Sequence, residues 1–508
     1  MARERRKGGD RDRARQYGKG WAMNDHTLGL RGTRRALLRG TVAAVGVGLT
    51  AGVLAACGPA GRGAAPTGGS APVVLKLYPP QDWYNIGPQW MQFFQPGMDY
   101  FETQNPGIRV QVGAPLPGNN GKYVSEIIAG VGPDVFEDFT PAPYLEAHLV
   151  LDLSKYLQRD NINPSIWSPG EMHGLGTAGG VYFLPNGIHV NAMGINLSLL
   201  DEMGLAYPEP DWGYAEATRL FQAATHDKGG IHHYGVHLQF AGSSLGTNIY
   251  VLHNFGAALM DGSGTRCTLD DPRAIEAVRW ADQLYWAKVA GGPLDLENVP
   301  FIEVGTNSLL PNLRAWANNF KWTYFPVPKY PAGQFSFEAV QFYAVNVATA
   351  HPEEAWTLTR FLTAEPWWAR YEMKYLLRMP SIDALLQEFV AAVETVAPPA
   401  KGKHLDYFVT AADRWGVSPR VFRYADPAAR SMIDNAFALA FAQKVDVGTA
   451  LTRVARQVDA LEATSATEAP RVSGTALITE GERNRLRLEG MFSSGGSGRP
   501  NRPAGTGP

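Results

Sequence analysis

The chain has 508 residues, of which 45% are hydrophobic and 19% charged, so it can bury a large core and is long enough for more than one domain. Residues 1–57 carry 12 Lys and Arg against 4 Asp and Glu, which leaves 34 basic and 44 acidic residues, a net charge of −10, in the remainder. Binding to a phosphate backbone needs clustered Lys and Arg. We therefore do not expect nucleic acid as a partner.

The first 57 residues predict an export signal. Arg34 and Arg35, followed by two leucines, resemble a twin-arginine signal, and residues 40–56 carry no charge. This stretch is marginal for a membrane span and typical of a signal-peptide core. It ends in Leu-Ala-Ala-Cys, which resembles the lipobox of bacterial lipoproteins, and that resemblance implies a lipid on Cys57. A plain secretory signal or a short membrane anchor is the alternative.

Either Met1 or Met23 can be the start of the chain. Cys267 is the only cysteine besides the predicted lipidation site, so we expect no intrachain disulfide. Residues 58–72 are rich in Gly, Ala and Pro and predict a flexible tether. Residues 466–508 lose periodicity and predict a disordered tail.

Between tether and tail, short apolar runs alternate with amphipathic stretches. Asp270 and Asp271 provide a cap for one predicted helix, and Pro272 suits its first position. Strands that alternate with helices predict βαβ units and a mostly parallel sheet, which is an α/β fold. The predicted strands are 73–78, 108–112, 134–136, 181–185, 234–240 and 342–348, and the predicted helices are 90–104, 123–131, 214–224, 272–289 and 353–364.

Several segments resemble a known family in their order along the chain. They are FETQNPGIRVQV (101–112), GPDVFED (132–138), LVLDLSKYL (149–157) and YFLPNGIHVNAMGINLSLLDEMGL (182–205), followed by LDDPRAIEAVRW, FPVPKYP and HPEEAWTLTRFLTAE. Together they resemble the family 1 extracellular solute-binding proteins, the group that contains maltose-binding protein, over residues 73–465. The usual Tyr-Asn pair is Ile195-Asn196 here, and FIEVGTNSLLPNLRAW lacks the usual Ala-Met.

The resemblance implies a two-lobed, periplasmic-binding-protein-like fold of type II, with hinge crossovers and a ligand cleft between the lobes. It implies the substrate-binding subunit of an ABC importer: a monomer without catalysis or cofactor, anchored outside the cytoplasm and partnered by permease subunits. We expect its ligand to be a sugar or oligosaccharide. We assign 73–186 with 271–321 to the N-terminal lobe and 187–270 with 322–465 to the C-terminal lobe, with crossings near 184–189, 266–271 and 320–325.

Carboxylates and an indole are the first ligand-binding candidates. Trp83 follows the first strand, where its ring could stack on the apolar face of a sugar; packing in the core is the alternative. Glu137 and Asp138 end a short strand, where their oxygens could accept hydrogen bonds from sugar hydroxyls. A helix cap or a solvated acid is the alternative for these two residues.

Four further candidates come from the predicted crossings and from a late loop. The resemblance places His189 where maltose-binding protein presents an acidic sugar ligand, and an imidazole can donate or accept. Trp316 and Trp322 flank the third crossing. Arg378 matches a loop near the edge of the family's cleft, where it could pair with an acidic sugar. A surface arginine without a ligand is the alternative.

Other functions remain possible from the sequence. Residues 242–246 match the Gly-x-Ser-x-Gly pattern of hydrolases, with Ser244 as nucleophile and Asp261 and His351 available to complete a triad. A zinc site would need more than the nearby His232, His233 and His237, so we expect no metal. The same fold could also bind a peptide, a polyamine or an anion.

Overall fold

The computed structural model describes residues 71–113, 120–138, 141–167, 176–177, 180–238, 251–261, 266–293, 295–317, 319–417 and 427–468. All of them belong to the unit Gly69–Pro508. The twin-arginine pair, Cys57 and Ser244 lie outside the described residues, as do most of the tether and of the tail.

The described chain begins with a βαβ unit that the sequence predicts closely. β1 (Val73–Tyr78) and β2 (Ile108–Val112) pair in parallel, and α2 (Met91–Gln104) connects them. Phe94, Met98 and Phe101 are buried at a spacing that puts them on one face of α2, and they share a core with β1. A short helix, α1 (Gln81–Asn85), lies between β1 and α2.

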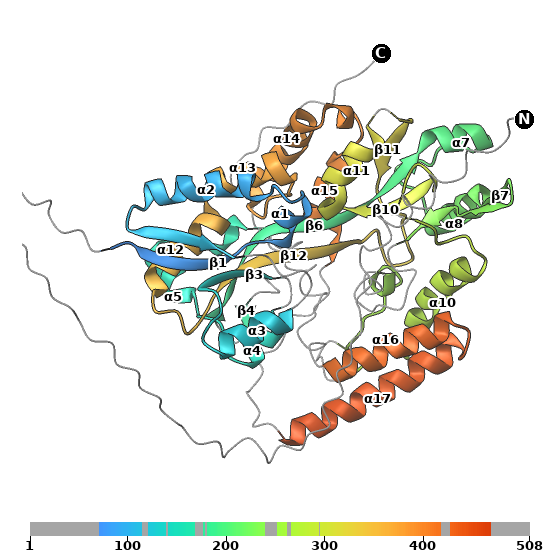
Figure 1. Cartoon of the computed structure of the whole chain (residues 1–508). Coiled ribbons are helices and arrows are strands. Elements are labelled where there is room, and N and C mark those ends of the chain that lie inside the picture. Colours follow the sequence, from blue (N-terminus) through green and yellow to red (C-terminus); the bar gives the residue numbers. More distant parts are fainter. Residues whose placement is uncertain are drawn as a thin grey trace, which may run out of the picture. The chain divides into compact units, whose positions relative to one another are not determined.

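A nine-stranded sheet forms the centre of the structure (Figure 1). Its order is β2-β1-β3-β12-β6-β10-β9, while β11 also pairs with β6 and β13 with β12. β1 pairs in parallel with β2 and β3, but β12 runs antiparallel to both β3 and β6. The α/β class is confirmed, and the sheet is mixed rather than mostly parallel. The bounds are β3 (Val135–Asp138), β6 (Phe183–Asn196), β9 (Val236–His237), β10 (Phe301–Gly305), β11 (Trp322–Phe325), β12 (Ser336–Val345) and β13 (Gly416–Val417).

β6 is the strand that connects the two main cores (Figure 1). All fourteen of its residues are buried, which requires cover on both faces. Its first half pairs with β12, and its second half pairs with β10 and β11. Leu184, Ile188 and Val190 belong to the first core, whereas Met193 and Ile195 belong to the second.

The two cores divide the chain at points other than the expected lobe limits. The first combines residues within 75–192 and 296–412, and the second combines residues within 193–301 and 429–458 with Tyr330. α10 (Pro272–Trp286), expected in the N-terminal lobe, packs in the second core with α16 (Pro427–Phe441) and α17 (Val447–Glu468). β12, expected in the C-terminal lobe, pairs instead with β3 of the first core.

The helices are capped by local chemistry where the sequence predicts it. Asp271 accepts a hydrogen bond from the backbone of Arg273, and Pro272 occupies the first turn of α10. The remaining helices are α3 (Asn120–Ile128), α4 (Ala142–Glu146), α5 (Ser154–Arg159), α7 (Leu197–Met203), α8 (Tyr214–Ala224), α11 (Leu309–Trp316), α12 (Pro352–Ala364), α13 (Pro366–Leu376), α14 (Phe389–Val396), α15 (Asp406–Thr410), α16 (Pro427–Phe441) and α17 (Val447–Glu468). The described residues also include four small strands, β4 (Gly176–Thr177), β5 (Gly180–Val181), β7 (His226–Lys228) and β8 (Ile231–His233).

Candidate functional site

Three neighbouring strands present polar side chains on one face of the sheet. In the pairing of β3 with β12, Glu137 lies opposite Tyr343, and in the pairing of β12 with β6, Gln341 lies opposite Gly187. Alternation along the strands puts His189 on the same face. Helices and the turn that follows α13 cover this face with more polar groups. We call the set the polar cluster: Asp82, Glu137, His189, Gln341, Tyr343, Glu372 and Arg378.

Arg378 lies at the centre of the polar cluster. Its Nη2 donates to Asp82 Oδ2 at 2.9 Å, and its Nη1 lies 3.9 Å from Glu372 Oε1. A Cβ atom on Gly187 would lie 2.7 Å from Arg378 Cδ, so the arginine stem crosses the strand where only glycine leaves room. The side chain is 1% exposed. Its guanidinium is thus engaged inside the protein.

Glu372, on α13, is held from two other sides. It accepts a hydrogen bond from Trp83 Nε1 at 3.2 Å. The register between β6 and β12 shifts at Asn186, and a bulge of this kind re-aims a side chain. The Asn186 amide fits with its nitrogen 2.9 Å from Glu372 Oε2 and its oxygen toward Arg378. Burial raises the pKa of Glu372 to about 7, against the opposing attraction of Arg378.

Glu137 and His189 are also kept from their charged forms by burial. Burial raises the pKa of Glu137 well above its usual range, although Arg378 opposes the shift. Burial likewise lowers the pKa of His189, while Asp82 opposes that shift from 3.6 Å away. Burial thus favours the protonated form of Glu137 and the neutral form of His189, and in these forms both side chains can donate and accept hydrogen bonds.

Asp82 and His189 form the more accessible edge of the polar cluster. Their side chains are 17% and 10% exposed, compared with 1–2% for Arg378 and Glu372. A molecule that approached the cluster would meet this carboxylate and this imidazole first. Since Asp82 already accepts from Arg378, its position is fixed before any ligand arrives.

Five buried polar atoms in the cluster make no hydrogen bond of normal geometry among the described residues, although His189 Nε2 lies 3.6 Å from Asp82 Oδ2 and the His189 side chain also interacts with Gln341. A buried polar atom whose hydrogen bond is not made lowers the stability of the folded protein by about 1–3 kcal/mol. Several of the five lie on adjacent positions of the same sheet face. The atoms are Glu137 Oε1, His189 Nε2, Gln341 Oε1, Tyr343 OH and Arg378 Nε.

The comparison with protein families identifies the chain. The family described as bacterial extracellular solute-binding protein matches residues 85–367, which is more than half of the sequence. The chain belongs to this family. The resemblance predicted from the ordered segments is therefore confirmed. The comparison with curated proteins gives no match.

Solved structures of other solute-binding proteins share the fold. An ABC substrate-binding protein from Listeria monocytogenes in complex with cycloalternan has a TM-score of 0.66 at 18% identity, covering 77% of this chain and 99% of its own. The GacH receptor of Streptomyces glaucescens has a TM-score of 0.61 at 17% identity, covering 78% and 99%. A cyclic alpha-maltosyl-1,6-maltose binding protein from Arthrobacter globiformis has a TM-score of 0.62 at 16% identity, covering 78% and 100%.

The predicted tryptophans of this solute-binding protein are all buried in aromatic packing. Trp83 is 0% exposed, and its ring lies 5.2 Å from that of Phe94 and 6.1 Å from that of Trp368. Trp316 and Trp322 contact each other with centroids 5.4 Å apart, and neither reaches the polar cluster in the described contacts. These contacts are those of tryptophans packed in the core, which was the alternative to sugar stacking. Trp83 touches the polar cluster only through its hydrogen bond to Glu372 in the described contacts.

Glu137 and Asp138 are separated by the alternation of the strand. Asp138 faces the opposite side of the sheet, where its carboxylate accepts a hydrogen bond from Tyr144 OH at 2.5 Å. The structure thus brings Glu137, His189 and Arg378 together and leaves Asp138 outside. Sequence reasoning missed Asp82, although it stands next to Trp83, and it missed Glu372 because nothing in an amphipathic helix marks that residue.

Histidines elsewhere have local partners. His232 bonds to Asp227 and to the carbonyl of Lys288, both at 2.8 Å, and His237 bonds to the carbonyl of Gly292. Within the described ranges, no three His, Cys, Asp or Glu side chains are grouped to hold a metal. In those same ranges, no helix combines the length and the apolar character needed to cross a membrane.

Proposed function

We propose that this solute-binding protein is the substrate-binding subunit of an ABC importer and that it captures a sugar or oligosaccharide at the Asp82–His189 edge of the polar cluster. The observation that carries the proposal is the group of five buried polar atoms behind that edge that make no hydrogen bond of normal geometry among the described residues. A polyol offers hydroxyls that both donate and accept, which suits a carboxylate, an imidazole and a protonated acid together.

Structures with the same fold support a carbohydrate ligand. One of these proteins has been solved in complex with cycloalternan and another with acarbose, a third binds cyclic alpha-maltosyl-1,6-maltose, and a fourth holds mannotriose. The charge of the cluster supports a neutral ligand. Arg378 is bonded to Asp82 and shielded from solvent, so an anionic ligand would meet the carboxylate rather than a free cation.

Affinity measurements on variants test this proposal. Calorimetric titration of the full chain should detect binding of a neutral oligosaccharide, such as mannotriose or acarbose, with amino acids, a polyamine and an ester substrate as comparisons. Asp82→Asn and His189→Gln should each weaken binding about tenfold, the loss of one charge-assisted or buried hydrogen bond. Asp201→Asn is the matched control, because that exposed carboxylate bonds only to Tyr207 and Lys321 in the described structure.

Thermal-shift screening of the same panel separates the remaining possibilities. A ligand that binds only the native state raises the melting temperature without being consumed. Stabilisation by an amino acid, a peptide or a polyamine, with none by any sugar, would contradict carbohydrate capture. Turnover of the ester that is abolished by Ser244→Ala would instead support the hydrolase alternative.

We also propose export through the twin-arginine route, lipidation of Cys57 and a monomeric state. The family is extracellular, and the sequence before the tether has the order of basic pair, uncharged core and lipobox-like end. Cys57→Ser should release the protein from the membrane fraction, because acyl chains on that residue supply the anchorage. Protein that still sediments with membranes after this change would contradict the lipid anchor. Arg34→Lys with Arg35→Lys should block export.

A further inference from the structure

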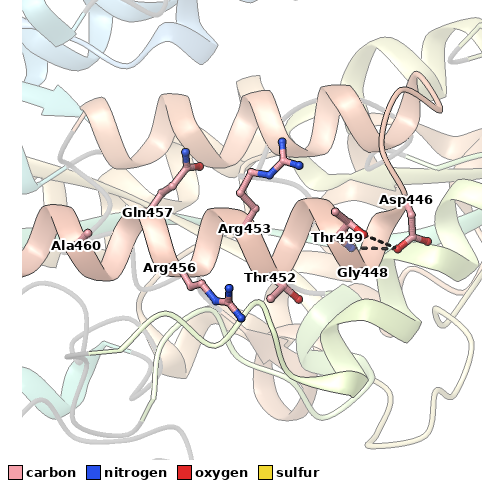
Figure 2. Close-up of a pocket in the computed structure, with 8 residues that line it drawn as sticks. All are labelled: Asp446, Gly448, Thr449, Thr452, Arg453, Arg456, Gln457 and Ala460. Carbon is pink, nitrogen blue, oxygen red and sulfur yellow. Dashed lines mark hydrogen bonds between the residues drawn. The ribbon is translucent and has the colours of Figure 1, made fainter.

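A hollow of about 700 Å³ runs along α17, on an element that contributes nothing to the polar cluster (Figure 2). Its lining comes from α17 and from the turn that precedes this helix. The lining residues are Asp446, Gly448, Thr449, Thr452, Arg453, Arg456, Gln457 and Ala460.

The negative charge in this lining is already neutralised. Asp446 accepts hydrogen bonds from the backbone and the hydroxyl of Thr449, at 3.0 and 3.3 Å, and from Arg279 Nη2 at 3.3 Å. The two arginines of the lining, in contrast, are not paired with an acid. Arg453 and Arg456 are exposed and have no carboxylate within 4 Å among the described residues. The hollow therefore offers two free guanidinium groups beside an amide and threonine side chains.

Arg219, Arg314 and Arg360 also have no carboxylate within 4 Å among the described residues, so Arg453 and Arg456 are set apart by lining one hollow together. Other arginines are paired. Arg273, Arg370 and Arg430 each lie within 4 Å of a carboxylate. Neither Arg453 nor Arg456 has a carboxylate at the helix positions four residues away, where an ion pair within α17 could form. Four residues before and after Arg453 are Thr449 and Gln457, and the corresponding neighbours of Arg456 are Thr452 and Ala460.

The nearest acid in sequence is engaged elsewhere. Asp459, three residues after Arg456, has its Oδ1 2.7 Å from the backbone nitrogen of Cys267. Like charges one helical turn apart also repel each other, so the pair has a cost within the isolated helix. The two side chains extend in different directions from α17 (Figure 2), and an anion that drew both guanidinium groups to itself would remove that cost.

We propose that the α17 hollow binds an oxyanion, namely a phosphate group carried by a small molecule or by a lipid head group. Guanidinium groups bind phosphate through paired, charge-assisted hydrogen bonds, and both side chains are long and unbonded, so they can turn toward one phosphate. Hydroxyl and amide groups beside them supply further donors. This site is independent of sugar capture, because it lies on α17 and uses none of the cluster's residues.

Hydrogen–deuterium exchange on the full chain tests the proposal, because it reports on α17 separately from the basic N-terminal region. Added inorganic phosphate should slow exchange in residues 446–460 of the native protein. Arg453→Gln with Arg456→Gln should shift the phosphate dependence of this protection by about tenfold or abolish it. Arg219→Gln, which removes an exposed arginine on α8 with no ion pair in the described structure, should leave the protection unchanged.

Vesicles distinguish the two sources of phosphate. Protection of 446–460 by phosphatidylglycerol vesicles but not by phosphatidylcholine vesicles, lost in the double variant, assigns the site to lipid head groups. Protection by inorganic phosphate alone assigns it to a soluble phosphate compound. Absence of protection under every condition, or protection that is equal in the double variant, would overturn the proposal. Sugar binding that persists in the double variant keeps this result separate from the proposed import function.

Discussion

Arg378→Met removes the positive charge from the polar cluster and keeps most of the aliphatic stem over Gly187. Asp82 loses the donor that lies 2.9 Å away, and Glu372 loses its cation at 3.9 Å. Breaking a buried ion pair by removing one partner costs about 3–5 kcal/mol, because the other charge stays buried. We expect a loss of this size in the free energy of unfolding at pH 8.

The same substitution should make stability more dependent on pH. The pKa of Glu372 is raised to about 7 in the folded protein from its ordinary value of 4.5. The protonated Glu372 carboxyl therefore contributes to the free energy of unfolding in full below pH 4.5. That contribution is lost as the pH rises through 7, which lowers the free energy of unfolding by about 3 kcal/mol. Arg378 holds this pKa down, as it does that of Glu137. Without it both carboxyls bind protons more tightly in the native state, so the loss extends to higher pH.

Urea unfolding at pH 5, 6.5 and 8 measures both effects. The destabilisation by Arg378→Met should grow as the pH rises. Arg370→Met is the matched control, since Arg370 bonds to Glu388 at 2.8 Å but its side chain is 52% exposed. An exposed pair contributes less than about 1 kcal/mol, so this variant should lose little stability at each pH. A penalty for Arg378→Met that matches the control, or that is the same at pH 5 and pH 8, would refute the reasoning.

Three further substitutions or reactions probe the packing. Trp83→Ala should lower the free energy of unfolding by roughly 3–5 kcal/mol in a denaturant titration, because the buried indole leaves a cavity; unchanged stability with lost sugar affinity would contradict this. Gly187→Ala should cost about 1–3 kcal/mol in thermal melting by displacing the Arg378 stem, whereas Gly107→Ala, whose new Cβ meets nothing within 4 Å, should cost less than about 1 kcal/mol. Burial raises the pKa of the Cys267 thiol to about 11, so peptide mass spectrometry should find it unalkylated at pH 8 until the protein unfolds.

The local parts of the fold could be predicted because their signals lie within a few residues of one another. Alternation and capping predict β1, β2 and the start of α10 at the residues where the structure has them. The end of α10 differs, since the helix stops at Trp286 and Lys288 adopts a positive φ of 54°. The division of the chain between the two cores could not be predicted in the same way, because it depends on β12 returning antiparallel between β3 and β6.

The sequence predicts only some residues of the polar cluster, for a related reason. Glu137 stands at the end of a predicted strand, and the family resemblance points to His189 and Arg378, so each has a signal of its own. Asp82 becomes a site residue through its bond to Arg378, which is 296 positions away in the sequence. No periodicity or spacing contains that information. The burial of Trp83 is likewise decided by α13, whose Trp368 and Tyr371 cover its ring.

The cluster atoms that make no hydrogen bond of normal geometry among the described residues also bear on why the chain keeps such a group inside a large core. Five of them at about 1–3 kcal/mol each are a substantial cost for a protein whose net stability is typically about 5–15 kcal/mol. Apolar residues of similar volume at Glu137 or Gln341 would remove part of that cost. Natural sequences rarely lie at their stability optimum, and binding sites are where the cost is commonly retained. The polar groups cost the free protein stability that a hydroxyl-rich ligand can restore, so ligand binding at the Asp82–His189 edge should stabilise the first core in particular.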